Sequence, residues 1–373
     1  MKRKKRIIVS VTNDLYTDQR VDKVCRYLHE NGFQVLLVGR KRRNSPVLDK
    51  REYATKRLRL LFEKGALFYA FFNVRLFLFL FFRRQDALLS NDLDALLANY
   101  LVAKIKRKKL VYDSHELFTE VPELIDRPRV RAVWLRIEKW IFPKLQNVYT
   151  VNDSIAEIYR KRYNVPVNVV RNVSPKWNTK NVPDKKKLGI PENKLILIIQ
   201  GAGINVDRGA EEAVEAMKSL ENTVLLIVGG GDVVPQLMET VKKENLTEKV
   251  LFIGKKPYKE LMYYTYYADI GLTLDKNTNL NYKYSLPNKV FDYIHGGTAV
   301  ISSDLIQVRR IVEAHDVGVV ISEVSPKKIV ESVQYFLDHP EILQAKKENC
   351  LKAAKKENWE EEKKVLKQVF EKI

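Results

Sequence analysis

Cysteine is nearly absent from this chain of 373 residues, with Cys25 and Cys350 as its two examples. They lie far apart and lack the spacing of metal ligands, which argues against a disulfide framework and a zinc site and fits a reducing cytosol. After the basic residues 2–6, only residues 7–11 form an apolar run, which is too short for the hydrophobic region of a signal peptide. We therefore expect a cytoplasmic protein.

Negative charge is scarce in the first half of the chain. Residues 1–176 hold 37 Lys and Arg against 18 Asp and Glu, whereas residues 177–373 hold 29 against 28. A basic half suits nucleic acid, an anionic membrane or an anionic substrate. The densest basic run, residues 104–109, lacks interleaved aromatics and a recognition motif, so we interpret it as a solvated helix end and expect no nucleic-acid partner.

Strand-like and helical segments alternate along most of the chain. A lysine-rich stretch with two prolines, residues 175–187, separates two such series of similar length. This pattern predicts an α/β protein with two doubly wound, Rossmann-like domains that face a cleft. We place the N-terminal domain at 1–176, the C-terminal domain at 177–355, and a final helix at 356–373 that packs back toward the N-terminal domain.

Residues 66–82 are almost entirely apolar, but Asn73 and Arg75 interrupt the middle of the run. A central arginine costs about 2.5–3.5 kcal/mol on membrane-insertion scales, which disfavours a spanning helix. A core helix and a helix in the membrane interface both remain open. Basic residues flank the run at 41–43, 56–59 and 83–84. That pattern suits an anionic lipid surface, on the inner membrane face.

The segment 285–301 predicts a short helix, a glycine stop and a buried strand. We expect Ser285 to cap the helix and Pro287 to lie in its first turn. Lys289 and Asp292 are three residues apart, on neighbouring positions of one face. Because a helix N-terminus attracts anions and a carboxylate can bind a hydroxyl pair, this helix suits the diphosphate and ribose of a nucleotide sugar.

A second phosphate-binding candidate joins a strand to a helix at residues 198–209. Gly201 would allow close backbone approach, and Arg208 near the helix start matches phosphate geometry. The three glycines at 229–231 are weaker evidence, because a tight turn alone explains them.

Ionisable residues also follow a strand of the first domain. Asp113, His115 and Glu116 come at its carboxyl end, where such sheets open on their ligand crevice. Asp92 and Asp94 have the spacing of a metal-binding pair in some sugar transferases, but Asp92 also fits a helix cap, which we prefer.

Taken together, these segments resemble the retaining family 4 glycosyltransferases (glycosyl transferases group 1) of the two-Rossmann GT-B architecture, with an N-terminal half like the bacterial envelope-polysaccharide members. The motifs that carry the resemblance are Gly201-Ala-Gly203 with Arg208-Gly209, residues 225–231, 250–254 and 286–293, and in the first half Asn13-Asp14, Asp18-Gln-Arg20 and residues 112–118.

The resemblance implies a donor site in the C-terminal domain and an acceptor site in the N-terminal domain. It implies catalytic roles for His115 and Arg208, of which His115 reaches the donor sugar and Arg208 neutralises the diphosphate. The donor-binding set is Gly201, Arg208, Asn288, Lys289 and Asp292, with Asp292 on the ribose. The acceptor-side set is Asp14, Asp18, Arg20 and Glu116.

The sequence departs from the family pattern in three ways. The usual pair of glutamates is replaced by Tyr284 and Asp292, and the arginine after the strand glycine is Ala202. The first loop lacks its usual glycines and reads Asn13-Asp14-Leu15-Tyr16.

The expected activity is metal-independent transfer of a sugar from a UDP- or GDP-sugar to an envelope glycan or lipid-linked acceptor, with retention and without a cofactor. A nucleotide-sugar epimerase and a basic nucleic-acid binder are the alternatives.

Overall fold

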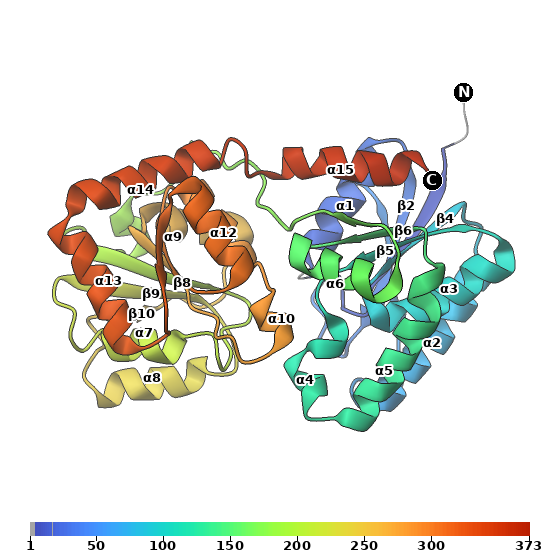
Figure 1. Ribbon diagram of the computed structural model, residues 1–373, viewed down its shortest axis with the longest axis horizontal. Helices are drawn as coiled ribbons and strands as arrows, with labels where there is room; N and C mark the ends of the chain where they lie inside the picture. Colours follow the sequence, from blue (N-terminus) through green and yellow to red (C-terminus); the bar gives the residue numbers. More distant parts are fainter. Residues whose placement is uncertain (1–3, 17) are drawn as a thin grey trace. The chain divides into compact units, whose positions relative to one another are not determined.

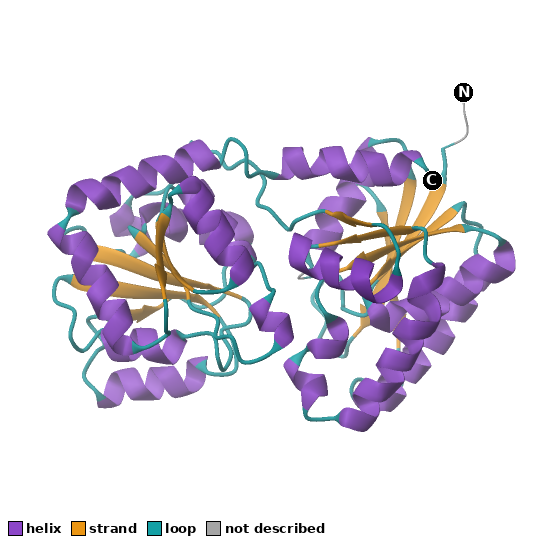
Figure 2. Ribbon diagram, viewed as in Figure 1, coloured by secondary structure: helices purple, strands orange, loops and turns teal. Residues whose placement is uncertain are grey.

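The computed structural model describes residues 4–16 and 18–373. It divides into two compact units, one formed by residues 1–172 with 363–373 and the other by residues 173–362. Each unit contains a parallel sheet with helices on both faces (Figures 1 and 2), so the expected α/β class with two Rossmann-like sheets is confirmed.

The sheet of the first unit has seven parallel strands in the order β3-β2-β1-β4-β5-β6-β7. The chain reverses its direction of travel across the sheet between β1 and β4, and ligands of such sheets bind at this switch point. The strands are β1 (Arg6–Ser10), β2 (Gln34–Lys41), β3 (Ala54–Arg59), β4 (Ala87–Asn91), β5 (Lys109–Ser114), β6 (Asn147–Thr150) and β7 (Val167–Val169).

Helices connect these strands. They are α1 (Gln19–Glu30), α2 (Gly65–Phe81), α3 (Leu93–Lys106), α4 (Pro122–Ile125), α5 (Pro128–Ile141) and α6 (Asp153–Tyr163). The apolar run at 66–82 forms α2, which buries Phe68, Phe72, Leu76 and Leu80 against the sheet and α3. The buried residues recur every four positions, so one side of α2 belongs to the core. No helix in the described residues is long and apolar enough to cross a membrane.

The sheet of the second unit has six parallel strands in the order β10-β9-β8-β11-β12-β13, with its switch point between β8 and β11. Alternate residues of β8 supply the apolar cores on its two faces, Leu197 and Ile199 on one and Ile196 and Ile198 on the other. The strands are β8 (Leu195–Gly201), β9 (Thr223–Gly229), β10 (Val250–Phe252), β11 (Ile270–Thr273), β12 (Ala299–Ser303) and β13 (Gly318–Ile321).

The helices of the second unit are α7 (Ala210–Ala216), α8 (Val234–Lys243), α9 (Tyr258–Tyr267), α10 (Leu280–Lys283), α11 (Asn288–Gly296), α12 (Ile306–His315), α13 (Pro326–Asp338) and α14 (Pro340–Ala353). The final helix α15 (Trp359–Glu371) reaches the first unit, where the Phe370 ring lies edge-on to Phe33 and Tyr149.

Two expected helix caps are wrong. Helix α11 begins at Asn288 after Pro287, and Ser285 instead donates through its hydroxyl to the Tyr282 carbonyl oxygen at 2.9 Å. Asp92 does precede α3, but its φ of 57° turns the side chain away and its carboxylate makes no capping hydrogen bond. Ser285 is used by a local turn, and Asp92 by a tertiary contact with His115.

Candidate functional site

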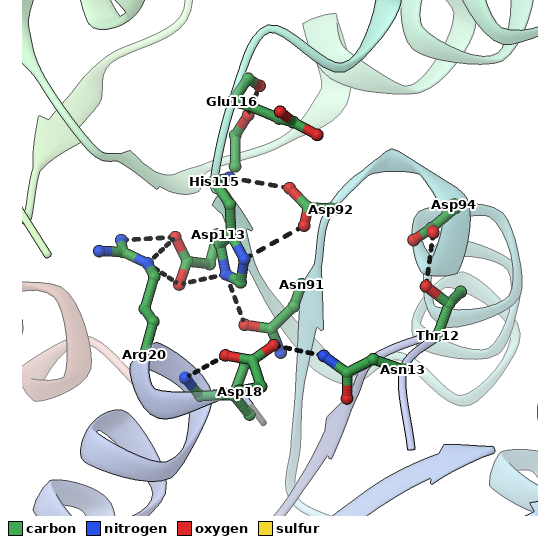
Figure 3. Close-up of polar contacts among 12 residues, drawn as sticks. Thr12, Asn13, Asp18, Arg20, Asn91, Asp92, Asp94, Asp113, His115 and Glu116 are labelled. Carbon is green, nitrogen blue, oxygen red and sulfur yellow. Dashed lines mark hydrogen bonds and ion pairs between the residues drawn. The ribbon is translucent and has the colours of Figure 1, made fainter. Parts of the chain in front are cut away.

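The first cluster of functional groups lies at the switch point of the first sheet, where β1, β4 and β5 end (Figure 3). Asp113 is near the end of β5 and His115 directly follows this strand, while Asp92 follows β4. Because neighbouring parallel strands end at the same edge, Asp92 and His115 meet here although they are 23 residues apart in sequence. Register brings Asn91 of β4 beside Asp113 of β5.

Both ring nitrogens of His115 have acidic partners. Nδ1 lies 3.2 Å from Asp92 Oδ2, and Nε2 lies 3.2 Å from Asp113 Oδ2 and from Asn91 Oδ1. The other Asp92 oxygen accepts the His115 backbone N–H at 2.8 Å. The imidazole is therefore fixed in orientation, with 19% of its side chain exposed.

Arg20 holds Asp113 in place from helix α1. Its guanidinium donates from Nη2 to Asp113 Oδ1 at 2.7 Å and from Nε to Oδ2 at 3.0 Å, and its Nη1 donates to the Val170 carbonyl oxygen at 2.8 Å. The Arg20 side chain is 3% exposed and that of Asp113 is 0% exposed. A buried pair of this geometry is a positioning device, because Asp113 in turn fixes His115.

These contacts set the protonation of the cluster. Burial opposes a charge on His115, but Asp92 and Asp113 outweigh it and raise the pKa of the imidazole to about 10. Burial likewise opposes a charge on Asp113, and the Arg20 guanidinium and His115 lower the pKa of its carboxyl to about 2. Burial raises the pKa of Asp92 to about 7, although His115 acts in the opposite direction. At neutral pH His115 is an imidazolium.

A pH titration can check this assignment. The folded-state pKa of His115 lies above its unfolded value of about 6.5, so the stabilisation from its charge is complete below pH ~6.5 and is lost as pH rises through about 10. We expect NMR of protein labelled at the histidine ring carbons to show one ring that stays protonated past pH 8. That signal should disappear in His115→Gln, which assigns it. A His115 signal that titrates near pH 6.5 would contradict the arrangement.

Asp94 points to the same edge of the sheet but has a different partner. The Thr12 hydroxyl donates to its Oδ2 at 2.6 Å, and its Oδ1 is buried without a hydrogen-bond partner. Burial raises the pKa of Asp94 to about 6. Among the described residues, no group of three or more histidines, cysteines or carboxylates has the geometry of a metal site. Asp92 contacts His115, and Asp94 accepts from Thr12.

The predicted acceptor-side residues surround this cluster, in differing roles. Asp18 caps α1, accepting from the Val21 N–H at 3.0 Å. Asp14 accepts from the Tyr16 N–H at 3.0 Å in the loop after β1. Arg20 is enclosed, as described, and Glu116 directly follows His115 (Figure 3). Asp14 and Glu116 are half-buried and can meet a ligand, whereas Arg20 acts through Asp113.

The second unit has its own cluster where β8, β9 and β11 end. The loop that follows β8 at Gly201 packs tightly against the turn that follows β9. A Cβ atom on Gly229, whose φ is 148°, would lie 1.8 Å from the Gly201 carbonyl oxygen. The glycines in this turn are therefore required by close backbone packing. The Lys276 N–H donates to the Asp207 carbonyl oxygen at 2.8 Å and joins this loop to the end of β11.

Two predicted donor-site cations meet at a carboxylate that sequence reasoning missed. Arg208 Nη1 lies 3.1 Å from Asp275 Oδ1, and Lys289 Nζ lies 3.2 Å from Asp275 Oδ2. The Asp275 side chain is 2% exposed, that of Lys289 is 11% exposed and that of Arg208 is 32% exposed. Two cations share one carboxylate, and the site is open to solvent on the Arg208 side.

Asp292 is engaged within the second unit. Its Oδ1 accepts from the Tyr258 hydroxyl at 2.8 Å and from the Ser174 hydroxyl at 2.5 Å, and its Oδ2 accepts from the Gln200 amide at 3.1 Å. The residue is 7% exposed. These donors hold the carboxylate in the middle of α11, and a ribose would have to replace or join them.

Of the residues that were missed, Asp275 had a signal that was available. Asp275, like Asp113, comes at the carboxyl end of a buried strand, here residues 270–274. Its position after a strand indicated a functional residue, but only the tertiary structure shows that Arg208 and Lys289 contact it. Gln200 and Tyr258 carried no distinguishing pattern.

Comparison with known protein families finds a match in each half of the chain. Residues 182–357 match the family model Glycosyl transferases group 1, and residues 18–173 match the model Glycosyltransferase Family 4. The chain thus combines two glycosyltransferase domains. This finding favours a glycosyltransferase over an epimerase or a nucleic-acid binder. A search of curated protein sequences gives no match.

Solved glycosyltransferase structures share the fold of this chain. A sucrose-phosphate synthase from Thermosynechococcus elongatus has a TM-score of 0.77 at 17% identity, with 99% of each chain covered. The Anabaena protein Alr3699/HepE, solved in complex with UDP, has a TM-score of 0.72 at 12% identity, with 99% of this chain and 100% of the other covered. WaaG, a glycosyltransferase involved in lipopolysaccharide biosynthesis, has a TM-score of 0.67 at 15% identity, with 98% and 99% covered. At these identities the likeness establishes the GT-B fold.

Proposed function

We propose that this glycosyltransferase moves a sugar from a nucleoside-diphosphate sugar to a glycan or lipid-linked acceptor of the cell envelope. The observation that carries the proposal is the convergence of Arg208 and Lys289 on Asp275 at the switch point of the second sheet. Ligands of doubly wound sheets bind at this point, and two cations with one buried carboxylate between them leave a net positive charge for a diphosphate. The UDP bound to Alr3699/HepE, a protein of the same fold, supports a donor of this class.

In the proposed reaction the bond between the sugar and the diphosphate breaks and negative charge develops on the departing diphosphate. Arg208 and Lys289 stabilise that charge electrostatically, which lowers the barrier without requiring a metal ion. Gly201 gives the backbone room to approach the donor. Asn288 at the start of α11 and Asp292 in its middle bind the nucleoside, and His115 hydrogen-bonds the donor sugar. We further propose retention, with attack on the face that the diphosphate leaves and transfer of the acceptor proton to the departing phosphate.

A thermal-shift screen of UDP-, GDP- and other nucleotide sugars tests this function. We expect one nucleotide class to raise the melting temperature, since a ligand that binds only the folded state stabilises it by about 2.7 kcal/mol at one hundred times its Kd. The shift should survive EDTA, because protein cations hold the diphosphate. If no nucleotide sugar shifts the melting temperature with or without divalent cations, the donor assignment is wrong.

The outer side of α2 supports a further part of the proposal, contact with an anionic membrane on the cytoplasmic side. Opposite the buried stripe, Leu67, Val74 and Leu78 are exposed at 62%, 58% and 48%. Arg83 and Arg84, both exposed, follow the helix. An apolar face beside cations fits the interface of an anionic leaflet, which attracts each cation by about 1 kcal/mol.

Liposome flotation can test this contact. We expect the protein to float with vesicles that contain anionic lipid and not with neutral vesicles. The double variant Val74→Ser and Leu78→Ser should reduce flotation, whereas Leu351→Ser on α14, an exposed leucine of the second unit, should not. Equal and negligible binding to both kinds of vesicle would refute the membrane contact and leave the glycosyltransferase activity unaffected.

A further inference from the structure

A hollow of about 640 Å³ opens at the carboxyl edge of the first sheet, beyond β1, where β2 and β3 end. The register of these parallel strands places Lys41 beside Arg59, so both strands end in a cation. We call this feature the basic hollow. Its lining is Lys41, Arg42, Arg43, Arg59, Leu60, Leu61, Phe62, Glu63 and Lys64.

The basic hollow carries five cations against one carboxylate. Within residues 4–16 and 18–373, no ion pair to a carboxylate is made by Lys41, Arg42, Arg43, Arg59 or Lys64. The carboxylate Glu63 instead accepts the backbone N–H of Arg43 at 3.0 Å through Oε1. Like charges gathered in a concave surface raise the local potential and draw in an anion. Solvated surface cations usually spread apart, whereas these line one cavity of a size typical of ligand sites.

A second hollow of about 310 Å³ adjoins the first and shares Arg42, Glu63 and Lys64 with it. It adds Arg40, whose guanidinium lies 4.5 Å from the centre of the Phe68 ring. Arg40 Nη1 donates to the Glu63 carbonyl oxygen at 3.2 Å, but its Nε is buried without a hydrogen-bond partner. Arg40 therefore adds a further cation to the lining, held between the Glu63 carbonyl oxygen and the Phe68 ring.

The start of helix α2 also borders the second hollow. Gly65, its first residue, lines the cavity, and its first turn contains no acidic side chain. The first N–H groups of a helix have no partners within the helix, and they attract anions together with the helix dipole. Cations and a helix N-terminus are thus gathered in one place.

Contacts connect this region to the His115 cluster. The Arg40 N–H donates to the Asn13 carbonyl oxygen at 2.9 Å, in the loop after β1 that also contains Thr12, the partner of Asp94. Tyr69, which lines the second hollow, has its pKa raised by burial and then by Asp94. Tyr69 thus borders the second hollow and interacts electrostatically with Asp94.

We propose that the basic hollow binds the phosphate or diphosphate group of the acceptor. Arginines match such groups with paired N–H donors, and Arg42 and Arg43 provide two of them. An acceptor anchored here by its phosphate would direct its sugar along the second hollow toward Asp94 and Glu116. The apolar Leu61 and Phe62 at the rim fit the hydrocarbon of a lipid-linked acceptor. This inference rests on the proposed function, because it assigns the substrate class of the acceptor side.

The test uses inorganic pyrophosphate as the probe, titrated by calorimetry into the full chain already saturated with UDP. Saturation occupies the Arg208 site, so further binding reports the acceptor side. We expect wild type to bind pyrophosphate and the triple variant Arg42→Ser, Arg43→Ser and Lys64→Ser to bind at least tenfold more weakly. A control removes the same charge from exposed lysines of the second unit, Lys352→Ser, Lys355→Ser and Lys356→Ser. It should bind like wild type.

A second experiment, with lipid vesicles, distinguishes the two possible sources of the acceptor phosphate. Binding to vesicles that contain phosphatidic acid, lost together with pyrophosphate binding in the triple variant, supports a lipid-borne phosphate. Loss of pyrophosphate binding alone supports a soluble phosphorylated acceptor.

Two results would overturn the inference: no pyrophosphate binding by wild type, or equal binding by the triple variant. Equal pyrophosphate binding with lost vesicle binding would also overturn it, since the cations would then serve only as membrane surface charge. UDP binding is measured separately beforehand. A protein that fails to bind UDP contradicts the donor assignment, while the difference in pyrophosphate binding between wild type and the triple variant still reports on the basic hollow.

Discussion

Replacing Arg208 by alanine is expected to lower kcat for sugar transfer about 100- to 1,000-fold, as for loss of one preorganised donor to developing charge in other enzymes. Arg208 Nη1 lies 3.1 Å from Asp275 and its guanidinium is partly exposed, so it can move onto a diphosphate. Transfer kinetics with the donor identified by the thermal-shift screen measure the loss. Without Arg208, Lys289 alone would neutralise the departing group.

Two further variants show whether the loss of kcat is specific to the Arg208 guanidinium. Arg208→Lys keeps the charge but loses the paired donors, so its kcat should fall between those of wild type and Arg208→Ala. Arg310→Ala on α12 removes an exposed arginine of the same unit and should leave kcat unchanged. The melting temperature of each variant without ligand reports folding. Wild-type kcat in Arg208→Ala would refute the donor site as assigned.

The second large effect is on stability and comes from Arg20. Substitution by methionine should lower the free energy of unfolding by about 3–5 kcal/mol, because it leaves Asp113 as a buried and half-compensated carboxylate. The Val170 carbonyl oxygen also loses its donor. Urea unfolding at pH 7 measures this change. The deficit should shrink toward acidic pH, where Asp113 can take up a proton and no buried charge remains.

Arg26 provides the matched control on the same helix. It pairs with Asp22 at 2.9 Å, but its side chain is 45% exposed. Exposed pairs of this kind contribute about 0.3–0.5 kcal/mol, so Arg26→Met should be nearly neutral. If both variants lost a similar free energy of unfolding, burial of the Arg20–Asp113 pair would not determine its contribution to stability.

Much of the fold follows from the sequence because parallel strands buried on both faces are continuous apolar runs. Residues 195–200 and 223–228 identified two neighbouring strands of the second unit in this way. The glycine signal also predicted the end of α11 correctly, because Gly297 ends this helix with a φ of 70°. The environment of the apolar run that forms α2 could not be decided from the sequence. An almost uniformly apolar helix does not show which of its sides packs against the core.

The site was harder to predict than the fold, for a physical reason. Sequence position identifies which side chains follow a strand, but pairing between strands decides what they touch. His115 and Arg208 were found by position, whereas the ion pair of Arg20 with Asp113 joins residues 93 apart in sequence. The hydroxyl and amide donors that hold Asp292 come from residues 174, 200 and 258, which no local motif connects.

The central claim is that the donor diphosphate binds where Arg208 and Lys289 converge on Asp275. A crystal structure of the protein with UDP tests it most directly. The account predicts diphosphate oxygens within hydrogen-bond distance of the Arg208 guanidinium and the Lys289 ammonium, at the carboxyl ends of β8 and β11. A diphosphate bound elsewhere, with both cations still on Asp275, would contradict it.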